Sequence, residues 1–214
     1  MTTELPIRCA CGQLEGVASD VSASTGNHVI CYCDDCQLFQ HFLGSAARVL
    51  DAHGGTRIYQ MSPGRFRVTS GKEHLACMRL TPGGIVRWYA DCCNTPVGNT
   101  LATSKVPFVG VVTACFGNPD VKTLEAAFGP VKCGVNGRFA LGNRDEVDAH
   151  DKAPLSLVWG FFGKMLKWRL RGDHKRSPFF DPETGKLSAV PKVLSEGELQ
   201  DLKQKRQSFD RAAA

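Results

Sequence analysis

The segment Cys31-Tyr32-Cys33-Asp34-Asp35-Cys36 places three cysteines within six positions. Three protein thiolates with a fourth position left open are typical of a catalytic zinc site, whereas a fourth protein ligand makes a zinc site structural. The candidates for that fourth ligand are His28, His41 and Cys77. The spacing leaves both interpretations open. Under either one, it predicts that the chain folds around a metal ion at Cys31, Cys33 and Cys36.

Two further cysteine pairs lie on either side of this segment. Cys9 and Cys11 are separated by one residue, and on a strand such side chains point to the same side. A structural zinc needs four ligands, so two more sulfurs must come from elsewhere. Cys92 and Cys93, which follow a predicted hairpin, are expected to supply them.

Ala90 complicates this second site, because a C-x-x-C pair ending at Cys93 would begin at position 90. Either both adjacent cysteines bind the ion with a strained backbone, or Cys93 binds it alone and Asp91, Cys77 or water completes the set. The simplest alternative is a group of reduced cysteines without an ion. A redox role for Cys92 and Cys93 is the least favoured, because adjacent cysteines form a disulfide only with strain.

The composition is that of a globular protein in a reducing compartment. The chain has 214 residues, 43% of them apolar and 22% charged, so it can bury a core of its own. Residues 1–6 lack the basic start and apolar run of a secretory signal, and no run of 18 apolar residues is present. We therefore expect a cytoplasmic protein whose ten cysteines are metal ligands or buried thiols rather than disulfides.

Most strand-like patterns lie in the first 130 residues, where short alternating runs are separated by turn residues. Residues 73–80 and 85–89 flank the tight turn Thr81-Pro82-Gly83-Gly84 and so predict a hairpin. Further strands are expected at 7–12, 27–33, 64–70 and 108–115, and a short helix or irregular turn at 37–50. The chain is therefore predicted to form a mainly β zinc-binding domain over residues 1–130.

Residues 131–214 differ in character, since a glycine-rich connection is followed by basic helices that we expect to pack on the domain. Pro154 suits a first helical turn and Gly172 ends the helix. Its apolar side chains fall on one face, namely Leu155, Val158, Trp159, Phe162, Met165 and Leu166. Ser195 and Glu198 form a capping-box pattern at the start of a second helix.

The net charge of +5 belongs to the C-terminal segment. Residues 1–150 carry 13 basic and 13 acidic side chains, whereas residues 151–214 carry 13 basic and 8 acidic ones. A basic amphipathic helix can bind nucleic-acid phosphates or lie on a membrane surface. It can also pack on the domain or on a second copy of the chain. A nucleic acid, a membrane surface and a second copy of the chain therefore all remain candidate partners for residues 154–176.

Together these motifs resemble those of the glutathione-dependent formaldehyde-activating enzyme and centromere protein V family. The likeness spans residues 7–115 and rests on Cys9-Ala10-Cys11-Gly12, on the segment 31–36 and on Arg87-Trp88-Tyr89-Ala90-Asp91-Cys92-Cys93-Asn94-Thr95-Pro96. The resemblance implies a folded-over all-β zinc domain, called a β-tent. It implies that the matching Cys9, Cys11 and Cys93 hold a structural zinc.

The resemblance also implies that zinc held by Cys31, Cys33 and Cys36 lies at the active site of a carbon–sulfur lyase. Its substrate would be an adduct of formaldehyde with a small thiol such as glutathione. This sequence departs from the family pattern at Ala90, where a cysteine is usual, and at Asn94, where glycine is usual. Residues 37–41 also replace the family's small residues, and the C-terminal extension has no counterpart.

Two functional hypotheses follow. The first is a zinc-dependent carbon–sulfur lyase that joins or parts a small aldehyde and a thiol. The second is a non-catalytic zinc module that binds a protein, nucleic-acid or membrane partner through its basic C-terminal helix. Four arginines at alternate strand positions either line a pocket for a carboxylate-bearing ligand or form the solvated face of a sheet: Arg65, Arg67, Arg79 and Arg87.

Overall fold

The computed structural model describes residues 3–117 and 120–213, and nine of the described strands form one mixed sheet. In spatial order these strands are β11 (Ala149–His150), β10 (Cys133–Val135), β3 (Asn27–Cys31), β4 (Thr56–Met61), β9 (Val109–Val112), β8 (Thr95–Thr100), β7 (Val86–Ala90), β6 (Leu75–Arg79) and β12 (Lys192–Val193). Strands β10 and β12 pair with β3 and β6 in parallel, and strands from both sides of residue 130 thus share this sheet.

A second, antiparallel sheet contains β1 (Thr3–Arg8), β2 (Glu15–Val21) and β5 (Phe66–Ser70), in that order. The main core includes residues of both sheets. Ile7, Ala18 and Phe66 of the small sheet are buried in one cluster with Trp88 and Val111 of the large sheet. This apolar burial fixes how the ends of β1 and β7 approach each other, which matters for the cysteines that follow these strands.

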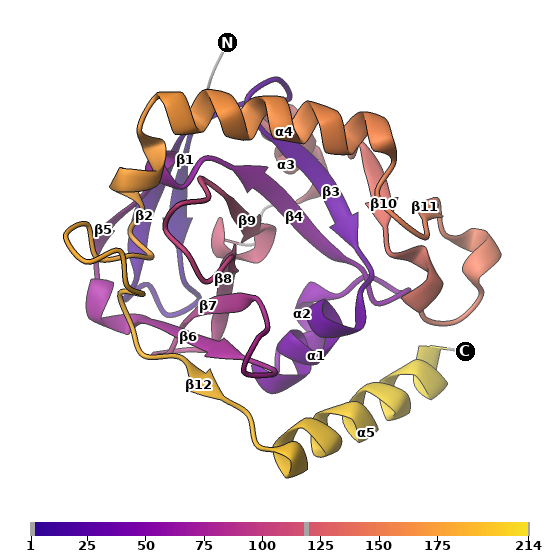
Figure 1. The fold of residues 1–214 in the computed structure, drawn as a ribbon. Coiled ribbons are helices and arrows are strands. Elements are labelled where there is room, and N and C mark those ends of the chain that lie inside the picture. Colours follow the sequence, from indigo (N-terminus) through magenta and orange to yellow (C-terminus); the bar gives the residue numbers. More distant parts are fainter. Residues whose placement is uncertain (1–2, 118–119, 214) are drawn as a thin grey trace.

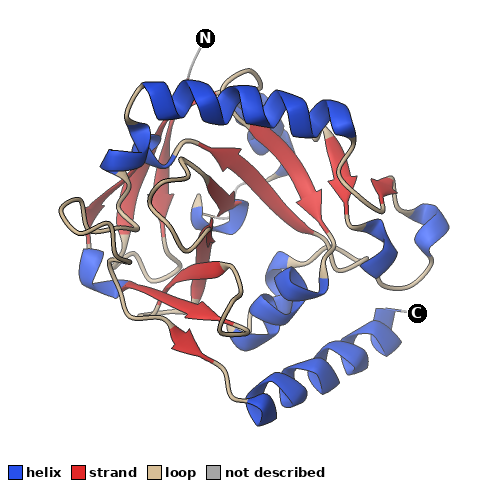
Figure 2. Cartoon of the chain, viewed as in Figure 1, coloured by secondary structure: helices blue, strands red, loops and turns tan. Residues whose placement is uncertain are grey.

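Helices surround the sheets, as Figures 1 and 2 show. They are α1 (Asp34–Phe42), α2 (Ala46–Val49), α3 (Val121–Phe128), α4 (Leu155–Leu170) and α5 (Glu196–Ala213). Short 3₁₀ helices lie at η1 (Pro63–Arg65), η2 (Lys72–His74), η3 (Thr113–Cys115), η4 (Gly137–Phe139), η5 (Arg144–Glu146) and η6 (Asp173–Arg176). Helices account for 34% of the structure and strands for 29%, so the fold is mixed α/β rather than mainly β.

Local physics explains two helices within the first 130 residues. In α1, Asp34 and Asp35 lie in the first turn, where the helix dipole favours negative charge, and Phe39 is buried. In α3, the Asp120 carboxylate caps the helix by accepting a hydrogen bond from the backbone N–H of Thr123. The segment 37–50, predicted as a short helix or irregular turn, contains most of α1 and all of α2, whereas α3 was not predicted from the sequence.

The predicted hairpin and the predicted helix are both confirmed. Strands β6 and β7 pair antiparallel with Cys77 opposite Trp88. Helix α4 begins after Pro154, and Gly172 adopts a φ of +71° just beyond its end, which glycine does at little cost. The strand expected at 108–115 is shorter, because the chain turns into η3 after Val112. None of the described helices is both long enough and apolar enough to cross a bilayer.

Candidate metal centres

Four thiols gather where two turns meet. Cys9 and Cys11 lie in the turn that follows β1, and Cys92 and Cys93 lie in the turn that joins β7 to β8. The strand alternation expected to align Cys9 with Cys11 is therefore not the cause of their proximity. A tight turn brings them together instead, in which Gly12 donates a hydrogen bond to the carbonyl of Cys9 at 3.0 Å.

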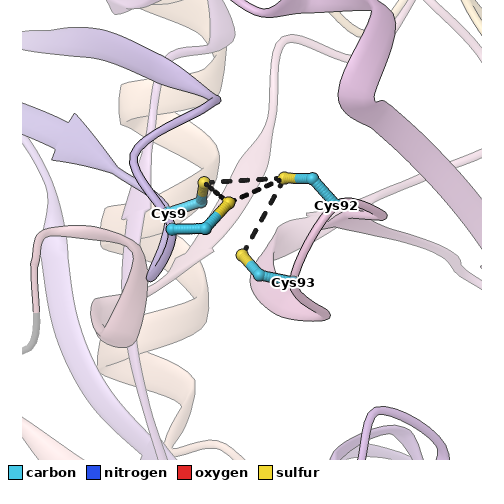
Figure 3. A group of neighbouring side chains, drawn as sticks. Cys9, Cys92 and Cys93 are labelled. Atoms are coloured by element: carbon cyan, nitrogen blue, oxygen red, sulfur yellow. Dashed lines mark hydrogen bonds between the residues drawn. The ribbon is translucent and has the colours of Figure 1, made fainter.

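The sulfur spacing fits a tetrahedral ion. Sγ of Cys9 lies 3.5 Å from that of Cys11 and 3.7 Å from that of Cys92. Cys11 and Cys92 are 3.4 Å apart, and Cys92 and Cys93 are 3.9 Å apart. Tetrahedral zinc with bonds of about 2.3 Å separates its sulfurs by about 3.8 Å, whereas a disulfide bond measures about 2.05 Å. Figure 3 shows the sulfurs facing one another across the two turns.

The turn after Ala90 allows both adjacent cysteines to join the group. The backbone N–H of Cys93 donates to the carbonyl of Ala90 at 3.4 Å, and Asn94 follows with a φ of +54°. Asparagine tolerates this left-handed conformation better than most residues.

The alternative ligands considered for this site have other partners. Asp91 accepts a hydrogen bond from Nδ1 of His74 at 3.2 Å, and both lie with Cys92 in a smaller, more exposed group. Cys77 lies in the main core, where its Sγ is 3.4 Å from the carbonyl of Ala189. The four thiols alone therefore form a complete donor set.

Hydrogen bonds reach two of these sulfurs, those of Cys9 and Cys93, from groups outside the four thiols. The backbone N–H of Leu14 donates to Sγ of Cys9 at 3.2 Å. Burial raises the pKa of Cys93, but hydrogen bonds from the Thr95 hydroxyl and from Cys11 outweigh it and lower that pKa to about 6. Cys93 is thus held toward the thiolate, which is the form that binds a metal ion, whereas burial and the hydrogen bonds with Cys11 and Cys9 raise the pKa of Cys92.

The second group contains three thiols at the junction of β3 and α1. Cys31 ends β3, Cys33 precedes α1, and Cys36 lies in the first turn of that helix. Sγ of Cys31 and Sγ of Cys33 are 3.4 Å apart, and all three sulfurs lie within 4.8 Å of one another. Cys31 and Cys36 are buried and Cys33 is partly exposed. The group therefore reaches solvent at Cys33.

Among the side chains that the structure describes, those of residues 3–117 and 120–209, no fourth histidine, cysteine or acidic group joins these three thiols. Nδ1 of His28 donates to the carbonyl of Gly129 at 3.0 Å, and the ring packs against Phe128. His41 packs edge-on against Phe209. Cys133 packs against the apolar cluster that contains Cys31 and Cys36, but it does not belong to the group of three sulfurs. The geometry therefore does not support a four-ligand structural zinc site in which His28, His41 or Cys77 supplies the fourth ligand.

A buried guanidinium completes the surroundings of this group. Arg87 donates through Nη1 to Sγ of Cys36 at 3.8 Å and to Oδ1 of Asn99 at 3.2 Å. Its Nη2 lies 3.3 Å from the Asp35 carboxylate. Hydrogen bonds from Cys31 and Cys33, with the charge of Arg87, hold the pKa of Cys36 well below that of an ordinary thiol.

The four strand arginines do not converge on one pocket. Arg65 approaches Asp20, Arg67 is exposed, and Arg79 donates to the carbonyl of Pro82. Arg87 alone of these four reaches a thiol group. The alternating sequence pattern predicted the same surroundings for all four arginines and did not indicate that Arg87 is buried.

Helix α5 braces the segment that carries the three thiols. Nε of Arg206 donates to Oε1 of Gln37 at 2.6 Å, and its Nη2 lies 2.9 Å from the Asp34 carboxylate. Gln37 is buried and donates in turn to the carbonyls of Tyr32 and Phe139. The sequence contained no signal for this contact, because its partners are 169 residues apart.

Comparisons with known proteins identify a family without assigning an activity. Among curated proteins, no sequence matches the chain. A crystal structure of a Rhodobacter sphaeroides protein from a structural genomics programme is 17% identical, with a TM-score of 0.40, and the match covers 59% of this chain and 97% of that one. The model of DUF6151, described as a family of unknown function, matches residues 1–190. The chain therefore belongs to the DUF6151 family.

Proposed function

We propose that the protein binds two zinc ions and acts as a carbon–sulfur lyase on the adduct of a small aldehyde with a glutathione-like thiol. One observation carries the proposal: Cys31, Cys33 and Cys36 form a sulfur group that no fourth metal-binding side chain completes within the described residues. The complete group of Cys9 and its partners then serves as the structural site. Sulfur-rich donor sets favour zinc over harder cations.

The proposed reaction breaks or forms one carbon–sulfur bond. In the forward direction the substrate sulfur adds to the carbonyl carbon of the aldehyde, and the thiol proton ends on the carbonyl oxygen. A bound zinc would supply a coordination position for the substrate sulfur or for that oxygen. The resemblance to the formaldehyde-activating family supports glutathione and formaldehyde as the first substrates to test.

The protein's own side chains would hold this site in place. Cys31 receives a hydrogen bond from Nδ2 of Asn136 at 3.5 Å, which orients its sulfur. Three thiolates and one zinc carry a net charge of −1, and the buried Arg87 beside Cys36 offsets it. Cys33 is the partly exposed member of the group, so it is the position at which a small thiol would approach.

The alternative is a non-catalytic zinc module that binds a partner through the basic C-terminal segment. The observation that favours it is the apolar outer face of α4, where five large side chains are exposed. The two functions make different demands on the chain, because a module needs α4 and zinc but no reactive position at Cys33.

The deciding experiment measures metal content and turnover in the same preparations. Native protein purified without chelator should contain two zinc ions per chain and accelerate the exchange between glutathione, formaldehyde and their adduct, followed by NMR. Cys33→Ser should lose one zinc and the acceleration. Cys133→Ser is the matched control, since Cys133 lies in the same apolar cluster outside the sulfur group.

Two outcomes would contradict the proposal. Acceleration that survives in Cys33→Ser would exclude the three-thiol group as the reaction site. Two zinc ions in native protein with no acceleration for any thiol and aldehyde pair would favour the non-catalytic module.

A further inference from the structure

Helix α4 presents an unusual outer face. Its exposed apolar side chains are Leu155 (76% exposed), Trp159 (74%), Phe162 (55%), Leu166 (61%) and Leu170 (80%). Successive members are three or four residues apart, so they form one row along the helix. In Figure 1, α4 runs along the outer edge of the molecule, on the side opposite α5.

A different face of α4 attaches the helix to the protein. Trp168 is buried, and Phe161 packs edge-on against Phe108 with ring centroids 5.3 Å apart. Nζ of Lys164 donates to the carbonyl of Gly26 at 2.5 Å. Of the six apolar side chains that periodicity placed on one face, four are exposed (Leu155, Trp159, Phe162 and Leu166) and two are half-buried (Val158 and Met165). The exposed row therefore lies outside, and the described residues leave it uncovered.

The charges on α4 itself all have one sign, and Arg171, directly after the helix, lies 3.9 Å from the Asp20 carboxylate. Between Lys152 and Gly172 the sequence contains no acidic residue. Lys167, Arg169 and Arg171 are exposed on α4 and directly after it. Asp173, the first acidic residue beyond them, is buried and bonded to Ser62 and Arg176. The outer face of α4 is thus apolar at its centre and cationic at its margins.

We propose that α4 is an interfacial helix that binds the surface of a lipid bilayer containing anionic lipids. Helices of this kind lie in the membrane plane with leucine, tryptophan and phenylalanine below the headgroups and basic residues beside the lipid phosphates. With 16 residues, α4 is about 24 Å long and too short to span a bilayer. Membrane binding of this kind does not require the lyase reaction.

Anionic lipid matches this face better than two other partners do. A nucleic acid would neutralise the basic side chains but would leave the five apolar ones in water. A second copy of this chain would cover the apolar row but would bring the same basic side chains of α4 against those of the first copy. An anionic bilayer satisfies both features at once.

Tryptophan fluorescence of the full-length protein reports directly on this contact. The chain has three tryptophans, and Trp88 and Trp168 are buried. Trp159 is therefore the tryptophan whose emission should shift to the blue when vesicles of phosphatidylcholine with 30% phosphatidylserine are added. Brominated lipids should quench it, and co-sedimentation with the vesicles should weaken as salt rises.

Two variants and one matched control test the two parts of the surface. Leu166→Glu should weaken vesicle binding at least tenfold, because it places a charge within the apolar row. Arg169→Gln, which keeps the apolar row, should weaken it about fivefold. Val190→Glu is the control, because Val190 is an exposed apolar residue outside α4, and it should bind as the native chain does.

Several results would overturn the proposal. One is the absence of both co-sedimentation and a blue shift at low salt with anionic vesicles. Another is equal binding to vesicles of phosphatidylcholine alone, which would exclude the charge match. Retention on a DNA or RNA duplex without vesicle binding would assign α4 to nucleic acid. A dimer in light scattering that shields Trp159 without lipid would assign it to a second copy.

Discussion

Nη1 of Arg87 lies 3.8 Å from Sγ of Cys36, so β7 places a buried guanidinium directly against the three-thiol group. These residues are 51 positions apart in the chain. A positive charge at this position favours thiolates around it, and thiolates favour a cation between them. Arg87 is therefore a positioning residue for the proposed second zinc site.

Arg87→Met should weaken zinc binding at the second site by about 10- to 100-fold, the range found for residues that support metal ligands. The measurement is a competition titration with a chromophoric chelator on protein that retains its first zinc. Arg79→Met is the matched control, because Arg79 donates to the carbonyl of Pro82 away from both thiol groups. Equal affinity in the native chain and in Arg87→Met would contradict this role.

Removal of metal from the first site should destabilise the whole protein. Cys11 and Cys92 join segments 81 residues apart, and an ion that binds only the folded chain stabilises it in proportion to its affinity. At a free zinc concentration about 1,000-fold above the dissociation constant, that contribution is about 4 kcal/mol. Cys11→Ser and chelation should therefore each lower the melting temperature, measured by calorimetry.

The opposite result for the first site would be informative. Cys115→Ser offers a comparison at a buried cysteine outside both groups. If chelator left the melting temperature of the native chain unchanged while zinc analysis showed a metal-free protein, the first site would not be structural.

Arg206→Ala should lower the free energy of unfolding by about 1–3 kcal/mol, because it leaves the buried Oε1 of Gln37 without its donor. Urea denaturation measures the change. The neighbouring Lys205 is exposed, so Lys205→Ala is the matched control and should lie within about 0.5 kcal/mol of the native chain. A loss of equal size in both variants would show that Arg206 does not brace the thiol segment.

Two lysines near α4 share hydrogen-bond acceptors, and from this contact we predict a pH dependence of the free energy of unfolding. Lys132 and Lys164 both donate to the carbonyl of Gly26 and to Oδ1 of Asn27. Burial and the charge of Lys132 lower the pKa of Lys164 to about 8. Lys132→Met removes that charge and should raise the pKa of Lys164, measured by NMR titration of its Nζ.

The sign of the stability change follows from this shift. The pKa of Lys164 lies below the value of about 10.4 expected for an unfolded chain. Between about pH 8 and 10.4 the unfolded chain then binds more protons at this residue, so its contribution to the free energy of unfolding rises with pH. Lys132→Met should make that rise smaller, and an unchanged Lys164 titration would contradict the coupling.

Local chemistry explains which features could be predicted from the sequence. The extent of α4 follows from Pro154 and Gly172, since each acts on the backbone at its own position. The group at 31–36 and each local cysteine pair follow from spacing, because sulfurs one to three residues apart can share an ion once the chain turns. That Cys11 meets Cys92 across 81 residues depends on the fold. The mixed character of the fold was not predicted: a short helix or irregular turn was expected at 37–50, where α1 and α2 lie, but the short helix α3 was not expected.

The sequence by itself determined which sulfurs are near neighbours along the chain and where the basic C-terminal helix begins and ends. Only the tertiary structure decided that Arg87 lies beside Cys36, that Arg206 holds Gln37, and that the apolar row through Trp159 faces outward. Helix α4 carries apolar side chains on both its inner and its outer face, so periodicity cannot select the buried one. That choice depends on which surface the sheets and the segment at Gly26 offer to it, and this is a property of the assembled fold.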